Sequence, residues 1–78
     1  MPSKKPPSLK NVGYREVVKA FEQCGFSVSR QVGSHITMTK PGHVLILTVP
    51  AKKPVAEGTL KALIRNAGLT PQQFADLL

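Results

Sequence analysis

The sequence predicts an α+β fold in which a three-stranded antiparallel sheet carries helices on one face, in the order α-β-β-β-α-α. Two segments, residues 14–24 and 59–67, have apolar residues at helical spacing. Between them lie three short β-rich segments separated by turn-forming residues. A chain of 78 residues is expected to form one domain, so any functional site should be shallow and lie on the surface.

The first helix is predicted over residues 14–24, and Gly25 follows it at the position where a left-handed residue commonly ends a helix. Its apolar stripe consists of Tyr14, Val17, Val18, Phe21 and Cys24. Because Cys24 is the only cysteine and falls on this stripe, we expect a buried, unreactive thiol and no disulfide within the chain. Residues 1–10 contain three prolines and three lysines and are predicted to form a flexible basic arm before a domain of residues 11–78.

The three strands are predicted over residues 26–32, 36–39 and 44–49, with a turn at residues 40–43. If Lys40 pairs with His43, the pairs on the core side are Ile36 with Leu47 and Met38 with Leu45. The same register pairs His35 with Thr48, Thr37 with Ile46 and Thr39 with Val44 on the side that the helices leave open. Val44 and Ile46 on that open face imply that a loop or a partner covers them, and we favour the loop.

The register of the first strand depends on the turn at Gly33-Ser34. A two-residue turn at Gly33-Ser34 would place Phe26, Val28 and Val32 on the open face. We therefore expect a bulge or a longer turn at Gly33, which returns these side chains to the core and points Arg30 inward.

The second helix is predicted over residues 59–67, with Leu60, Leu63, Ile64 and Ala67 on one stripe and Gly68 after it. Thr70-Pro71-Gln72-Gln73 has the pattern of a capping box, in which Thr70 is the N-cap and Pro71 the first helical residue. A last helix is therefore predicted over residues 71–78, anchored by Phe74 and Leu78.

The chain carries 11 Lys and Arg against 4 Asp and Glu, a net charge of +7, which favours a polyanionic partner such as RNA, DNA, an anionic membrane or an acidic protein. No apolar run approaches the roughly 20 residues of a membrane span, so an intracellular soluble protein is expected. Metal-assisted hydrolysis needs clustered carboxylates. The acidic residues Glu16, Glu22, Glu57 and Asp76 are scattered, so we expect neither a metal site nor a cofactor.

His35 directly follows Gly33-Ser34, where a turn can expose backbone amides. A lone histidine is most often structural, but an exposed imidazole can also take or release a proton near neutral pH. In RNA the 2′-hydroxyl is a built-in nucleophile, and one base with nearby positive charge suffices to cleave the chain without a metal. Arg30, Lys40, Lys52 and Lys53 are candidates for contacts to the RNA backbone. Little sequence preference is expected, because Tyr14, Phe21, Phe26 and Phe74 all fall at core positions.

Several motifs in this order resemble the HicA toxin family, the mRNA interferases of toxin–antitoxin pairs. They are Cys24-Gly25-Phe26, Gly33-Ser34-His35, Thr48-Val49-Pro50, Gly58-Thr59-Leu60 and Ile64-Arg65-Asn66-Ala67-Gly68-Leu69, followed by Phe74. The resemblance implies a fold like that of double-stranded-RNA-binding domains, a catalytic histidine at His35, and a HicB-type antitoxin that covers the site. Two positions depart from the family pattern: Ile36 stands where many members have a second histidine, and Ala51-Lys52-Lys53 stands where many have a histidine after Val-Pro.

The sequence thus predicts a cytoplasmic toxin of a type II toxin–antitoxin system that cleaves mRNA without a metal. His35 would act as general base or acid, Gly33 and Ser34 would hydrogen-bond the phosphate, and the four cations would hold the RNA backbone. Two alternatives remain open at this point. One is an RNA-binding module without catalysis, and the other is an interaction protein whose charge serves only to bind an acidic partner.

Overall fold

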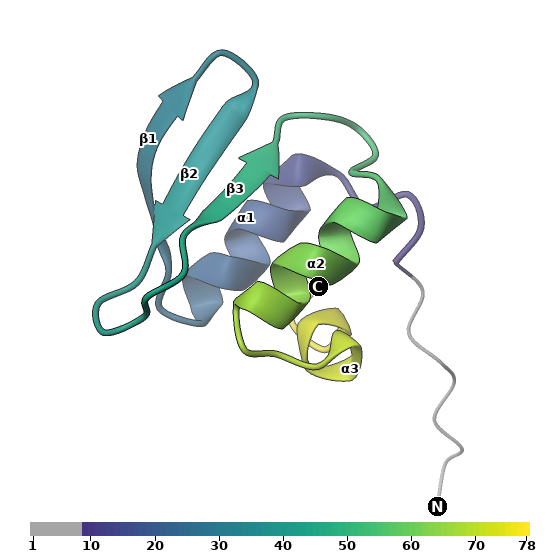
Figure 1. Ribbon diagram of the computed structural model, residues 1–78. Coiled ribbons are helices and arrows are strands. Elements are labelled where there is room, and N and C mark those ends of the chain that lie inside the picture. The colour runs from purple at the N-terminus through teal and green to yellow at the C-terminus, as the bar shows by residue number, and fades with distance from the viewer. Residues whose placement is uncertain (1–8) are drawn as a thin grey trace, which may run out of the picture.

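The computed structural model describes residues 9–78, and its elements follow the predicted order (Figure 1). Helix α1 spans Tyr14–Gln23, and the strands β1, β2 and β3 span Ser27–Val32, His35–Thr39 and Leu47–Pro50. Helices α2 and α3 span Glu57–Asn66 and Pro71–Ala75. The strands form one antiparallel sheet in the order β1-β2-β3, so the predicted α+β fold class is confirmed.

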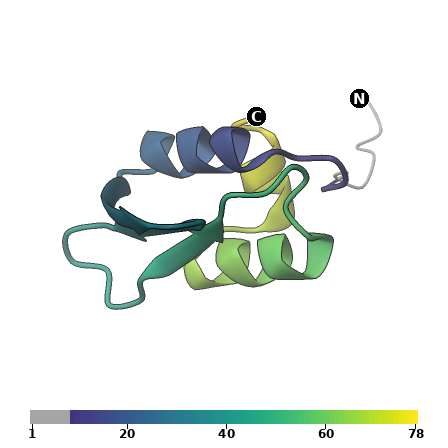
Figure 2. The same cartoon turned by 90° about the horizontal axis from the view of Figure 1, so that it is seen from above.

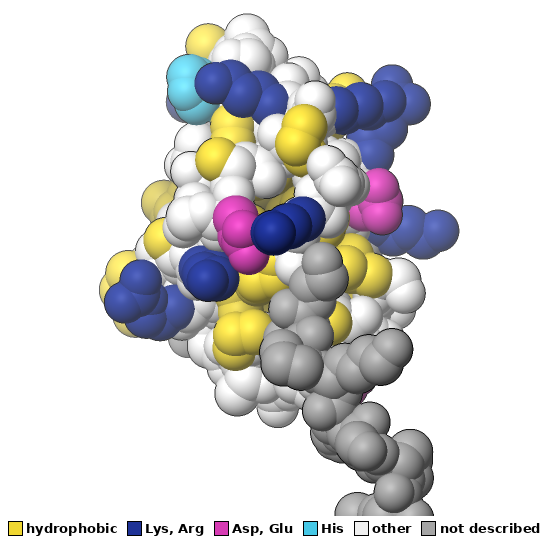
Figure 3. Space-filling view, turned by 90° about the vertical axis from the view of Figure 1, so that its right-hand side faces the viewer, with side chains coloured by type: hydrophobic (Ala, Val, Ile, Leu, Met, Phe, Trp, Pro, Cys, Tyr) yellow, Lys and Arg dark blue, Asp and Glu magenta, His cyan; other side chains and the backbone are white. Residues whose placement is uncertain are grey.

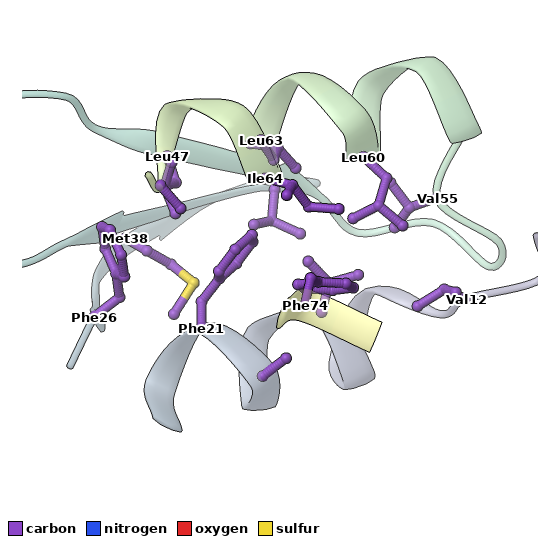
Figure 4. Packing of buried hydrophobic residues seen from close by; sticks show 14 of the residues in the cluster. Val12, Phe21, Phe26, Met38, Leu47, Val55, Leu60, Leu63, Ile64 and Phe74 are labelled. Carbon is purple, nitrogen blue, oxygen red and sulfur yellow. The ribbon is translucent and has the colours of Figure 1, made fainter. Parts of the chain in front are cut away.

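The helices cover one face of the sheet, and the core lies between them and the strands. Along β2 the side chains alternate, with Ile36 and Met38 buried and His35 exposed. Helix α3 lies between α1 and α2 (Figure 2). Figure 4 shows Phe21 of α1 between Met38 and Phe74 of α3, with the apolar residues of α2 on the other side of both rings. The other face of the sheet is left open to solvent.

The register between β2 and β3 differs from the prediction by two residues. Met38 pairs with Leu47, Ile36 with Val49, and His35 with Pro50. Because side chains alternate with a period of two, this shift leaves Ile36 and Met38 on the core face and His35 on the open face. The predicted pairing of His35 with Thr48 is therefore wrong, but the predicted faces of β2 are right.

The shift also shortens β3, which begins at Leu47 rather than at Val44. Leu45, predicted to face Met38 in the core, is 51% exposed. His43 explains the difference, because its backbone N–H donates to the carbonyl of Lys40 and its ring hydrogen-bonds the carbonyl of Asn66. This second bond holds the segment after the turn against α2, and residues 44–46 form an exposed part of the loop instead of pairing with β2.

The bulge of β1 lies between Val28 and Arg30, not at Gly33 as predicted. Gly33 and Ser34 form a two-residue turn, so Val32 pairs with His35 on the open face and is 58% exposed. Because of the extra residue in β1, Val28 before the bulge lies on the core side, whereas Val32 after it does not. Arg30 pairs with Thr37 and therefore lies on the open face, so the expectation that it points inward was wrong.

The ends of the described chain also refine the predictions. Leu9, the ninth residue of the predicted arm, is buried in the core, and residues 1–8 lie outside the described residues. The capping box of α3 is confirmed, because Thr70 Oγ1 accepts from Gln73 N at 3.1 Å while Gln73 Oε1 accepts from Thr70 N at 2.9 Å. Phe74 anchors this helix in the core, whereas Leu78, the second predicted anchor, is 51% exposed.

Candidate active site

His35 is the first residue of β2 and directly follows the tight turn of Gly33 and Ser34. Gly33 has φ +58, and no such positive value occurs at Ser34, which is the pattern of a type II′ hairpin turn. Nothing lies within 4 Å of where a Cβ on Gly33 would stand, so the backbone conformation alone calls for glycine here. The turn brings the imidazole of His35 to the open face, where it is exposed to solvent.

The loop after β3 starts beside His35. The Cα atom of His35 pairs with that of Pro50, and Ala51 N donates to the carbonyl of Ser34 at 2.7 Å. The next residues are Lys52 and Lys53, both exposed. The carbonyl of Lys52 accepts a hydrogen bond from Tyr14 N at 3.2 Å, which ties the loop to the start of α1. Backbone bonds therefore hold both lysines at the end of the sheet where His35 lies.

Further cations lie at this end. Arg30 shares the open face with His35, two residues along β1 from the residue that pairs with it. Arg15, on the first turn of α1, lines an open pocket together with Lys53. Figure 3 shows Lys and Arg side chains and a histidine at the upper end of the molecule, the end that holds the β1–β2 turn in Figure 1. With a net charge of +7 on the chain, this end is suited to bind a polyanion.

The structure does not bring Lys40 or His43 to His35. Lys40 follows the other end of β2, five residues away along the strand, which corresponds to roughly 17 Å. Its ammonium lies 5.5 Å from the centre of the Phe26 ring. His43 Nε2 lies 2.7 Å from the carbonyl oxygen of Asn66, and because a carbonyl only accepts, this nitrogen carries the proton. The two histidines thus occupy separate environments at opposite ends of β2.

The arrangement around His35 is suited to acid–base chemistry, because a single exposed imidazole lies near several positively charged side chains. Among residues 9–78, no cluster of three or more His, Cys, Asp or Glu side chains is placed to hold a metal ion. Within the same residues, no hydrogen bond restrains the His35 ring, so the side chain is free to meet a substrate. Ser34 contributes its hydroxyl and the turn contributes backbone N–H groups, which together can donate to a phosphate.

Arg15 is a residue near the candidate site that the sequence analysis does not single out. Its place near the candidate site depends on the hydrogen bond between Tyr14 and Lys52, which joins segments 38 residues apart in the chain. No local pattern signals such a contact. Tyr14 was predicted to be a core residue and is only partly buried, because it lies at the start of α1, beside the loop after β3.

Comparison with known proteins gives one positive finding. No curated protein matches the chain, and no helix among the described residues combines the length and apolar character needed to cross a membrane. A family model described as the HicA toxin of bacterial toxin–antitoxin systems matches residues 14–69. This match covers more than half of the chain and includes the Gly33-Ser34 turn, His35 and both loop lysines. The chain therefore belongs to the HicA family and is a toxin of a toxin–antitoxin system.

Proposed function

We propose that this toxin is an mRNA interferase, an endoribonuclease that cleaves mRNA without a metal and so stops translation. The observation that carries the proposal is the exposed imidazole of His35 on the open face, beside a tight turn and the loop of Lys52 and Lys53. An imidazole that serves only the fold would be expected to have a partner, as His43 has in Asn66.

The reaction proposed for His35 is an internal transfer within the RNA. The imidazole takes the proton of a 2′-hydroxyl, the O2′ atom attacks the adjacent phosphorus, and the bond from phosphorus to O5′ breaks. The products are a 2′,3′-cyclic phosphate and a 5′-hydroxyl, whose proton comes from the imidazolium or from water. In this scheme Gly33 and Ser34 donate hydrogen bonds to the phosphate oxygens, and Arg30, Lys52 and Lys53 offset the growing negative charge.

The partner proposed for the toxin is a HicB-type antitoxin that covers the open face in the cytoplasm. Membership of a toxin–antitoxin family implies an antitoxin. The net charge of +7 favours an acidic surface on that partner. Such a partner would compete with RNA for the same cations, so the toxin would neither bind nor cleave RNA while it is in the complex.

The test compares the wild-type chain with His35→Ala. We expect induction of the wild type to arrest growth and His35→Ala to leave growth normal, because the variant lacks the proton acceptor. In vitro, the wild type should cleave RNA in EDTA and leave cyclic phosphate ends, and His35→Ala should lose at least about 100-fold in rate. Products with 3′-hydroxyl ends, or cleavage only with Mg²⁺, would rule out the proposed reaction. Equal growth arrest by both proteins would favour RNA binding without catalysis.

A further inference from the structure

A second binding feature lies on the helix side of the sheet, at the free edge of β1. It is a small, mostly apolar pocket between α1 and the strands, lined by Tyr14, Arg15, Val18, Val28, Gln31 and Ile36. Ile36 is 5% exposed, whereas Val28 is 43% exposed although it pairs with the buried Met38. Because an apolar side chain is exposed on the helix-facing side of an edge strand, we expect a ligand to occupy this pocket.

The polar side chains that line the pocket, Arg15 and Gln31, each end in a planar group that can hydrogen-bond a ligand. The guanidinium of Arg15 lies 5.8 Å from the centre of the Tyr14 ring, and its Nε is 3.3 Å from the Tyr14 hydroxyl. Gln31 Nε2 donates to the carbonyl of Gly33 at 3.2 Å, which leaves Oε1 and the second N–H of its amide available. Apolar walls, an aromatic ring, a guanidinium and an amide are the groups with which proteins stack and hydrogen-bond single-stranded bases.

The pocket is linked to the candidate active site through β1 and β2. Gln31 pairs with Ile36, the residue after His35, and its amide is bonded to the turn that presents His35. The side chains of His35 and Ile36 point to opposite faces of the sheet. Because β1 is the edge strand, only one strand spacing of about 4.8 Å separates β2 from the free edge. An RNA strand with a phosphate at His35 can therefore pass over this edge and place a neighbouring base in the pocket.

We propose that the pocket between α1 and β1 binds one unpaired nucleobase next to the phosphate that is cleaved. This inference rests on the proposed function, and it replaces the expectation of weak sequence preference with a preference at one position of the RNA. A protein side chain is a poorer fit, because a purely aliphatic group would leave the amide of Gln31 and the guanidinium of Arg15 unused at the rim.

Tyr14 provides a direct test, because it is the only tyrosine and the chain has no tryptophan. In the inactive His35→Ala protein, we expect a short single-stranded RNA to quench the emission of Tyr14 in a saturable titration. Val28→Ser removes one apolar wall of the pocket and should weaken this binding about tenfold. Val44→Ser is the matched control, because it removes the same side chain from a position outside the pocket that is 94% exposed, and it should leave the affinity unchanged.

The possible results separate the two proposals. If His35→Ala binds single-stranded RNA, as measured by anisotropy of a labelled strand, without quenching Tyr14, the base pocket is wrong and the ribonuclease proposal stands. If His35→Ala has no affinity for RNA, both proposals fail. Equal quenching by duplex RNA would also overturn the pocket, because a paired base cannot enter it. Mapping of cleavage sites in random RNA completes the test: the wild type should prefer certain bases at one position, and Val28→Ser should lose that preference.

Discussion

At the scale of single residues, the two histidines show how the environment decides the role of one side chain. His43 donates to the carbonyl of Asn66, the last residue of α2, and packs edge-on against the ring of Phe26 at 5.2 Å. It thereby satisfies one of the carbonyl groups that every helix leaves unpaired at its C-terminus. His35 is exposed on the open face and is available to a substrate.

This difference predicts that alanine substitutions at the two histidines affect stability unequally. His43→Ala should lower the free energy of unfolding by about 1–2 kcal/mol, because it removes a hydrogen bond and the contact with Phe26. His35→Ala should change it by less than about 0.5 kcal/mol, because an exposed side chain is removed. Urea denaturation followed by circular dichroism measures both values. An equal loss in the two variants would contradict the separate roles.

Sequence reasoning predicted the placement of one of these two side chains. The alternation of β2 was enough to place His35 on the open face, because the apolar residues Ile36 and Met38 fix which face is buried. The contact between His43 and Asn66 spans 23 residues and depends on how α2 packs against the loop, so no local pattern could reveal it.

At the scale of elements, the backbone of the hairpin turn requires a glycine, whereas the backbone at the start of α2 does not. Gly33 has a positive φ, which costs other residues about 1–2 kcal/mol, whereas Gly58 lies in α2 without one. A Cβ at either position would meet nothing within 4 Å. We expect Gly33→Ala to destabilise the protein by about 1 kcal/mol and Gly58→Ala to stabilise it by up to about 1 kcal/mol. Thermal unfolding tests the pair, and a Gly33→Ala protein as stable as the wild type would argue against this turn.

The register of β3 provides a second test at this scale. Leu47 is fully buried opposite Met38, and Leu45 is 51% exposed in the loop. Leu47→Ala should therefore cost about 2–5 kcal/mol, while Leu45→Ala should cost less than about 1 kcal/mol. Denaturant unfolding of both variants distinguishes this register from the one expected from sequence, which buries Leu45 as well. Comparable losses in the two variants would favour the shorter turn.

The error in this register has a physical cause. Leu45 and Leu47 are chemically identical and would lie on the same face of a continuous strand, so hydrophobic alternation cannot choose between registers that differ by two residues. The length of the turn decides the register. The side chain of His43 favours the longer turn, because its ring is hydrogen-bonded to α2. The bulge in β1 was expected for a sound reason, the need to bury Phe26, but composition alone could not place it at Ser29.

At the scale of the whole molecule, the cations considered for RNA binding are unevenly placed along the sheet. Arg15, Arg30, Lys52 and Lys53 lie toward the end of the sheet that presents His35, whereas Lys40 lies at the far end of β2 with its ammonium near the Phe26 ring. An RNA strand that follows the first group would release counterions at the phosphates those residues contact. Lys40 would contribute only if the strand crossed the full length of β2.

This asymmetry predicts how salt affects RNA binding. In a His35→Ala background, which is expected not to cleave the RNA, the slope of log affinity against log salt concentration should become shallower by about 0.7 for each of Lys52→Gln and Lys53→Gln, the value for one phosphate of a single strand. Lys40→Gln is the matched control, since it removes the same charge, and it should leave the slope unchanged. Anisotropy of a labelled RNA between 50 and about 200 mM salt gives the slopes. An equal change in Lys40→Gln would mean that the RNA runs along the whole open face, and the loop after β3 would then be one contact among several rather than the main anchor of the substrate.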